Sequence, residues 1–109
     1  MSTLPATVPV VEIAPDVLPH VRARGVEAVY RHVLESVPRL FPTFRSLHVS
    51  IEPDVAIKDY VFIVFEARVP IEDVPDYREA IKRWDGDYVA AYPAPRQEPF
   101  LLHLIREEA

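Results

Sequence analysis

The segment from Asp59 to Val69 limits the possible folds of this chain more than any other. Its residues alternate as in a β-strand, yet most of both faces is apolar. One face carries Val61, Ile63, Phe65, Ala67 and Val69, and the other carries Tyr60, Phe62 and Val64 before Glu66 and Arg68. Such a strand is typical of a central position in a sheet that is covered on both sides. We therefore expect the second sheet face to be covered by the N-terminal arm, by a second copy of the chain or by a different protein.

Two helices and a strand are predicted before this segment. A continuous apolar stripe at helical spacing predicts a helix that ends at Pro38; it comprises Val26, Val29, Tyr30, Val33, Leu34 and Val37. Gly25 is expected to separate this helix from a shorter one that begins at Asp16. Leu47, Val49 and Ile51 alternate with polar residues, which indicates a strand with one buried face. This strand and the 59–69 segment are expected to form an antiparallel hairpin.

A further helix and a last strand are predicted after Pro70. Asp73 is a candidate helix cap, and Gly86 is expected to end the helix as a left-handed cap. The apolar stripe of this helix contains Tyr77, Ala80, Ile81, Trp84 and Tyr88. Residues 100–106 alternate well enough for a strand.

The N-terminal residues 1–15 are predicted to form an extended arm. They combine Pro5, Pro9 and Pro15 with apolar residues, which disfavours a helix or a central strand and favours a short edge strand near Val10 to Ile13. Residues 16–109 then form one domain, as expected for a chain of 109 residues.

Composition excludes several classes of function. The chain has no Cys and only two glycines, which argues against thiolate chemistry and glycine-rich phosphate loops. A net charge of −5 disfavours a phosphate-binding surface. Arginines nevertheless gather between residues 17 and 45, so nucleic-acid binding through Arg22, Arg24 and Arg31, with Arg39 and Arg45, stays as an alternative. No signal peptide and no membrane span are evident, so we expect a cytoplasmic protein.

Candidate catalytic residues lie on one strand face and the loop after it. His48 and Glu52 share that face with Ser50, and Asp54 follows; together they suggest a zinc or acid–base site. A solvated strand face explains them better. Trp84, Tyr88 and Tyr92 are similarly more typical of packing than of ligand stacking. We expect no metal and no cofactor, and a small enzyme remains an alternative.

The stretch from Ile51 to the C-terminus resembles uncharacterised short bacterial proteins, some of which are encoded beside a second small gene. The resemblance covers Glu52-Pro53-Asp54, the apolar strand 60–69, the helix that ends at Trp84-Asp85 and the final strand 100–105. It implies that the chain acts as the partner of another protein, in the manner of an antitoxin, and it assigns no functional residues.

These observations together predict an α+β fold. A small antiparallel sheet of about three to four strands carries two or three helices on one face. The predicted function is a protein-interaction module, either a homodimer or the partner of another small protein. Its binding surface is predicted to combine the arm with the second face of the central strand, through Val10, Val11, Ile13, Tyr60, Phe62 and Val64.

Overall fold

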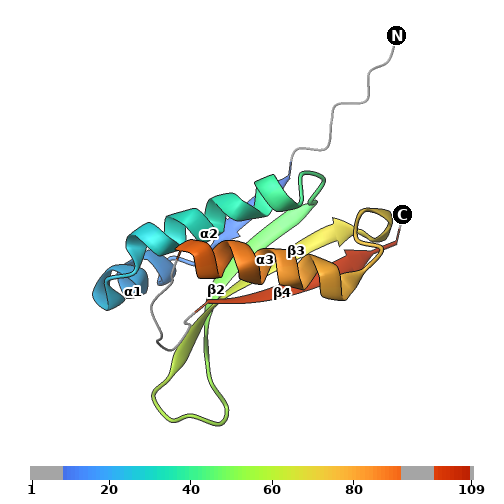
Figure 1. Cartoon of the computed structure of the whole chain (residues 1–109). Helices are drawn as coiled ribbons and strands as arrows, with labels where there is room; N and C mark the ends of the chain where they lie inside the picture. Colours follow the sequence, from blue (N-terminus) through green and yellow to red (C-terminus); the bar gives the residue numbers. More distant parts are fainter. Residues whose placement is uncertain (1–8, 92–99, 109) are drawn as a thin grey trace.

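The computed structural model of the chain describes residues 9–91 and 100–108. Within these ranges three α-helices lie on a four-stranded sheet (Figure 1). The elements in chain order are β1 (Val10–Ile13), α1 (Val17–Arg24), α2 (Glu27–Leu40), β2 (Ser46–Pro53), β3 (Val61–Pro70), a short 3₁₀ turn (Ile71–Asp73), α3 (Tyr77–Ala91) and β4 (Phe100–Glu107). The predicted α+β fold is confirmed, and so are the strand at Val10–Ile13 and the break between two helices at Gly25.

The sheet has the strand order β1-β2-β3-β4 and is mixed. Strands β2 and β3 form the expected antiparallel hairpin, in which Val49 is opposite Phe65. The outer pairs, β1 with β2 and β3 with β4, are parallel. This differs from the wholly antiparallel sheet expected from the sequence. The reason is that helices connect the strands of each outer pair, and a helical crossover returns the chain to the same end of the sheet.

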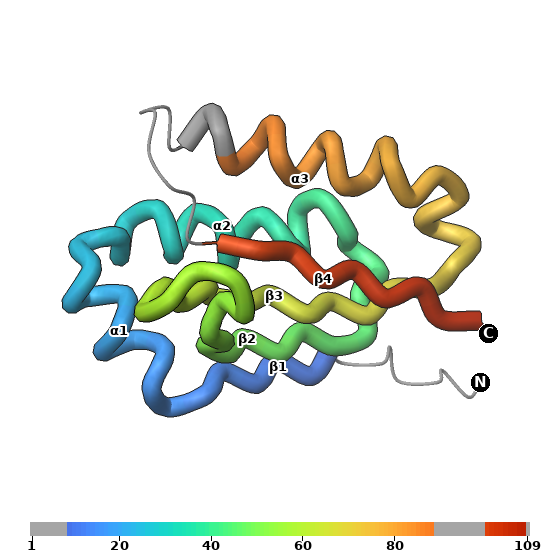
Figure 2. The backbone as a smooth tube through the Cα atoms, turned by 90° about the horizontal axis from the view of Figure 1, so that it is seen from below, coloured from blue at the N-terminus to red at the C-terminus, as the bar shows by residue number. Residues whose placement is uncertain are grey.

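The two helical crossovers have opposite hands. Both advance in the same direction across the sheet, from β1 to β2 and from β3 to β4, but their strands point in opposite directions. All the helices lie on one face, as Figures 1 and 2 show. One crossover is therefore left-handed, which is rare among parallel strand connections.

The core lies between this helical layer and one face of the sheet. From β3 it takes Ile63, Phe65, Ala67 and Val69, none of which is accessible to solvent. The ring of Phe65 lies 6.0 Å from that of Tyr30 on α2 and 6.1 Å from that of Phe100 on β4. These contacts join both crossover units into one core.

Three predicted element boundaries are wrong. Helix α2 continues past Pro38 to Leu40. Pro38 has no N–H to donate to the carbonyl of Leu34, four residues earlier, yet the last turn still closes because the N–H of Phe41 donates to the carbonyl of Val37. Helix α3 continues through Gly86 to Ala91, because Tyr88 extends its buried stripe. Asp76, rather than Asp73, caps α3 by accepting a hydrogen bond from the N–H of Glu79.

Among the described residues, no helix is long and apolar enough to cross a membrane.

Candidate functional site

None of the helices that the structure describes lies on the second face of the sheet (Figure 2). We call it the open face. The pairing register arranges its residues in rows across β2, β3 and β4: Ser50, Val64 and Leu101 form the row nearest the loop between β2 and β3, followed by the row of His48, Glu66 and His103 and then by that of Ser46, Arg68 and Ile105. Glu52 and Phe62 pair on the loop side of the first row. Val64 is 5% exposed between its neighbours, whereas Leu101 is 47% exposed. The open face thus has an apolar patch of Phe62, Val64 and Leu101 toward its loop end, while its middle row is polar.

The loop between β2 and β3 projects from the sheet on the side away from the helices (Figure 1). Asp54 shapes this loop: its carboxylate accepts hydrogen bonds from the N–H groups of Ala56 at 2.6 Å and Ile57 at 3.0 Å. Asp59 has a φ of 63°, in the left-handed region. Val55 is fully exposed at the loop and Ile57 is 47% exposed.

The loop and the open face together bound a cleft of about 270 Å³. The residues that line it come from the end of β2, the loop, β3 and β4: Glu52, Pro53, Asp54, Val55, Phe62, Val64, Leu101 and His103. The cleft therefore offers apolar side chains at its floor and two carboxylates at its rim.

The structure places Tyr60 just before β3, beside Phe62 and Val64 of β3 from the same predicted binding surface. The rings of Tyr60 and Phe62 meet edge to face, with centroids 5.0 Å apart. The guanidinium of Arg24 lies 5.5 Å from the centroid of the Tyr60 ring and donates a hydrogen bond to the carbonyl of Val61. This contact fixes one end of the open face against helix α1.

The open face has unlike charges at its two ends. The loop end carries three acidic side chains, those of Glu52, Asp54 and Asp59, and one basic side chain, that of Lys58. At the other end Arg68 and Arg45 share the carboxylate of Glu107, at 3.2 Å and 3.3 Å. Two guanidiniums on one carboxylate leave an excess of positive charge there, so the open face is electrically polar along its strands.

The predicted arm residues lie on β1, at the edge of the sheet. Val10, Val11 and Ile13 are 54%, 51% and 43% exposed. The register places Val10 on the open face, but Val11 and Ile13 on the helical side. Val11 there lines a groove of about 310 Å³ beside α2 with Leu34, Pro38, Phe44 and Leu47, and with Arg31 and Glu35. The arm and the open face are thus neighbouring surfaces that share Val10. Residues 1–8 of the arm lie outside the described residues.

The free edge of β1 is short. The N–H groups of Val10 and Ala14 donate to β2, so strand alternation turns those of Val11 and Ile13 outward. The next residues whose N–H would point outward are Pro9 and Pro15, but proline has no N–H. Prolines that flank an edge strand limit the pairing of another strand along it.

The arginines of the nucleic-acid alternative already have partners within the chain. Arg22 and Arg31 both pair with Glu27, at 3.2 Å and 2.6 Å. These bonds hold the pKa of the Glu27 carboxyl below its ordinary value, with the hydrogen bond from Arg31 as the largest cause. Arg24 contacts Tyr60 and Val61, as described above. A phosphate would have to compete with these partners.

The three residues proposed for the enzyme alternative have different structural roles. His48 and Glu52 are exposed on β2, while Asp54 holds the turn of the loop. Within residues 9–91 and 100–108, no group of three or more side chains is placed to hold a metal ion. Trp84 and Tyr88 are buried in the core beneath α3, and Tyr92 lies outside the described residues.

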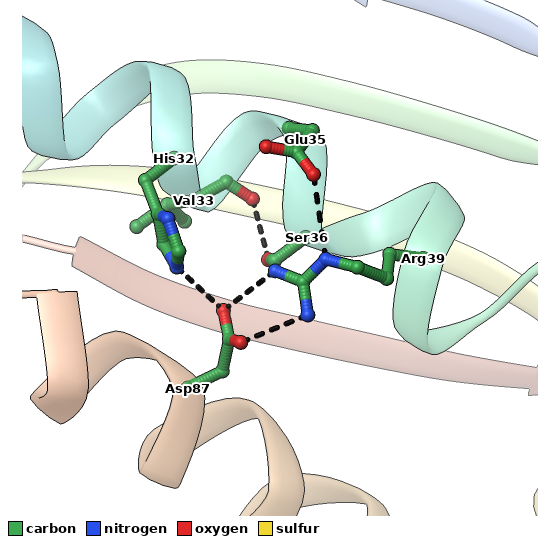
Figure 3. Close-up of polar contacts among 6 residues, drawn as sticks. All are labelled: His32, Val33, Glu35, Ser36, Arg39 and Asp87. Carbon is green, nitrogen blue, oxygen red and sulfur yellow. Dashed lines mark hydrogen bonds and ion pairs between the residues drawn. The ribbon is translucent and has the colours of Figure 1, made fainter.

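One polar cluster was not predicted from the sequence. Asp87 of α3 accepts hydrogen bonds from both terminal nitrogens of Arg39 on α2, at 2.9 Å and 3.1 Å (Figure 3). Its carboxylate also lies 2.9 Å from Nε2 of His32. The bonds from Arg39 are the largest cause that lowers the pKa of Asp87. This contact was not predicted because the helix was expected to end at Gly86, which would leave Asp87 outside α3.

Comparison with protein-family models, with curated proteins and with solved structures finds no significant match.

Proposed function

We propose that this chain is a protein-binding module whose binding surface is the open face of the sheet. One observation carries the proposal: the described helices cover a single sheet face, and the other has an apolar patch toward its loop end with the half-exposed Leu101 beside Phe62 and Val64. A strand face that only meets water is usually polar, as the outward residues of β2 are. Those of β3 and β4 break that rule near the loop.

The surroundings of this apolar patch also favour a protein partner. Interfaces commonly have an apolar core and a polar rim. Here Glu52, Glu66 and His103 lie next to the patch, and the projecting loop adds the exposed Val55 and Ile57. We propose as partner a second copy of the chain or another small protein. The second choice agrees with the partner role that the resemblance to short bacterial proteins implies.

Nucleic-acid binding is the weaker alternative. The net charge is −5, and Arg22 and Arg31 both pair with the carboxylate of Glu27. No observation on the open face favours phosphate over protein.

Site-specific photo-crosslinking in cells tests the proposed function. A photoreactive phenylalanine analogue replaces Leu101 on the open face, or Tyr77 on the helical side as a matched control, since these side chains are 47% and 38% exposed. We expect position 101 to give a discrete protein adduct, of a second copy or of another protein, and position 77 to give none. An equal pattern at both positions, or no adduct at position 101, would show that the open face does not bind protein.

A further inference from the structure

We infer that the open face binds the open face of a second copy, with the strands of the two copies antiparallel. This rests on the proposed function and specifies its partner. The two-fold axis would lie between the sheets, across the strands, at the row of Ser50, Val64 and Leu101. In this arrangement each residue of that row faces its own counterpart, so that Val64 and Leu101 meet apolar side chains of the second copy.

The charge pattern of the open face favours this axis. Reversing the strands places the acidic loop end of one copy, with Glu52, Asp54 and Asp59, over the end of the second copy where Arg45 and Arg68 share Glu107. By symmetry this occurs twice. Opposite potentials that meet in this way are the usual mark of a specific interface.

The register adds a second match. Glu52 is opposite Phe62, and His48 is opposite Glu66. These two β2 residues therefore lie at equal distances on either side of the row of Ser50, Val64 and Leu101, as Phe62 and Glu66 do on β3. Under the proposed axis the carboxylate of Glu52 faces the imidazole of His48 in the second copy, and the reciprocal pair forms as well. A hydrogen-bond acceptor thus meets a donor at two symmetric places.

The other face-to-face arrangement is disfavoured. An axis along the strands would place β2 over β4 and keep the strands parallel. The acidic loop ends would then lie over one another, and His48 would face His103, because both are opposite Glu66 in the register. Like charges placed together in this way destabilise an interface.

The size of the face sets the expected affinity. Strands β2, β3 and β4, of 8, 10 and 8 residues, span ~27 Å by ~14 Å, so the face offers at most ~400 Å² per copy. The total of ~800 Å² lies in the range of weak, transient interfaces. The projecting loops add to it. We therefore expect a dimer that dissociates in the micromolar range rather than an obligate one.

Charge reversal and mixing test this inference by sedimentation equilibrium of the full chain. Glu52→Lys makes the loop end more basic, and Arg68→Glu makes the opposite end more acidic. Each variant alone should self-associate at least ~10-fold more weakly than the unmodified chain, because like charges now meet. An equimolar mixture should associate again as a heterodimer. Lys82→Glu, on the exposed side of α3, is the matched control and should change nothing.

Two results would overturn the inference. One is a monomer at every concentration for the unmodified chain; the other is a dimer that both reversals leave intact or that mixing fails to restore. Unchanged melting of each variant confirms that folding is preserved, and Glu52→Gln and Arg68→Gln replace any variant that melts early. If self-association fails while position 101 still crosslinks to a different protein, the proposed function stands and only the second copy is wrong.

Discussion

The two glycines occupy opposite kinds of backbone position, although both were predicted to end a helix. Gly25 has a φ of 70° and caps α1, where its N–H donates to the carbonyls of the last turn. Gly86 lies inside α3 and has no atom within 4 Å of an added Cβ. Local sequence could not separate them, since residues that favour a helix stand on both sides of each. What keeps Gly86 helical is the burial of Tyr88, which is a tertiary effect.

Replacing each glycine by alanine should change stability in opposite directions. Gly25→Ala should lower the free energy of unfolding by about 1 kcal/mol, because a Cβ is strained in the left-handed region. Gly86→Ala should raise it by about 0.5–1 kcal/mol, because alanine loses less backbone freedom in a helix and the space is open. Urea unfolding of both variants measures this. Stabilisation by Gly25→Ala, or a loss from Gly86→Ala, would contradict the assignment.

At the scale of elements, alternation and helical spacing predicted where the strands and helices lie but not how the strands pair. The hairpin of β2 and β3 was predicted correctly because a short loop joins two strands that alternate. The parallel pairing of β1 and β4 was not, since the direction of a returning strand depends on the helices between. The contact between Asp87 on α3 and Arg39 on α2 joins residues 48 positions apart. No local pattern reports such a contact.

This contact should stabilise the packing of α2 against α3 in a pH-dependent way. The lowered pKa of Asp87 means that the folded state favours the charged carboxylate. The stabilisation is therefore complete above the pKa of an unfolded Asp, about 3.9, and is lost as the pH falls further. Asp87→Asn should cost about 1 kcal/mol at neutral pH, a modest value because Arg39 is partly exposed.

Unfolding measured across pH tests this expectation. The difference between the unmodified chain and Asp87→Asn should be constant near neutral pH and should shrink below about pH 4. Asp85→Asn, which is exposed on the same helix, is the control and should differ little from the unmodified chain at any pH. An equal loss for both variants would mean that the contact with Arg39 does not stabilise the fold.

At the scale of the whole molecule, one sequence feature predicted the main result. The two apolar faces of the 59–69 segment required cover on both sides, and the structure supplies helices for only one. Val64 is buried by its neighbours on the open face, but Leu101 remains half exposed. The sequence indicated Tyr60, Phe62 and Val64 as partner-binding residues. It could not indicate Leu101, because the neighbour of β3 is decided only when α3 returns the chain to the sheet.

The most direct test of the central claim, that the open face binds the open face of a second copy, is a methyl NMR dilution series of the unmodified chain. We predict concentration-dependent shifts for the methyl groups of Val64, Leu101 and Ile105 on the open face. The methyl groups of Leu34 and Ile81, which belong to the helical layer, should not shift. Shifts confined to the helical layer, or none in either set up to the highest soluble concentration, would contradict the binding of a second copy at the open face.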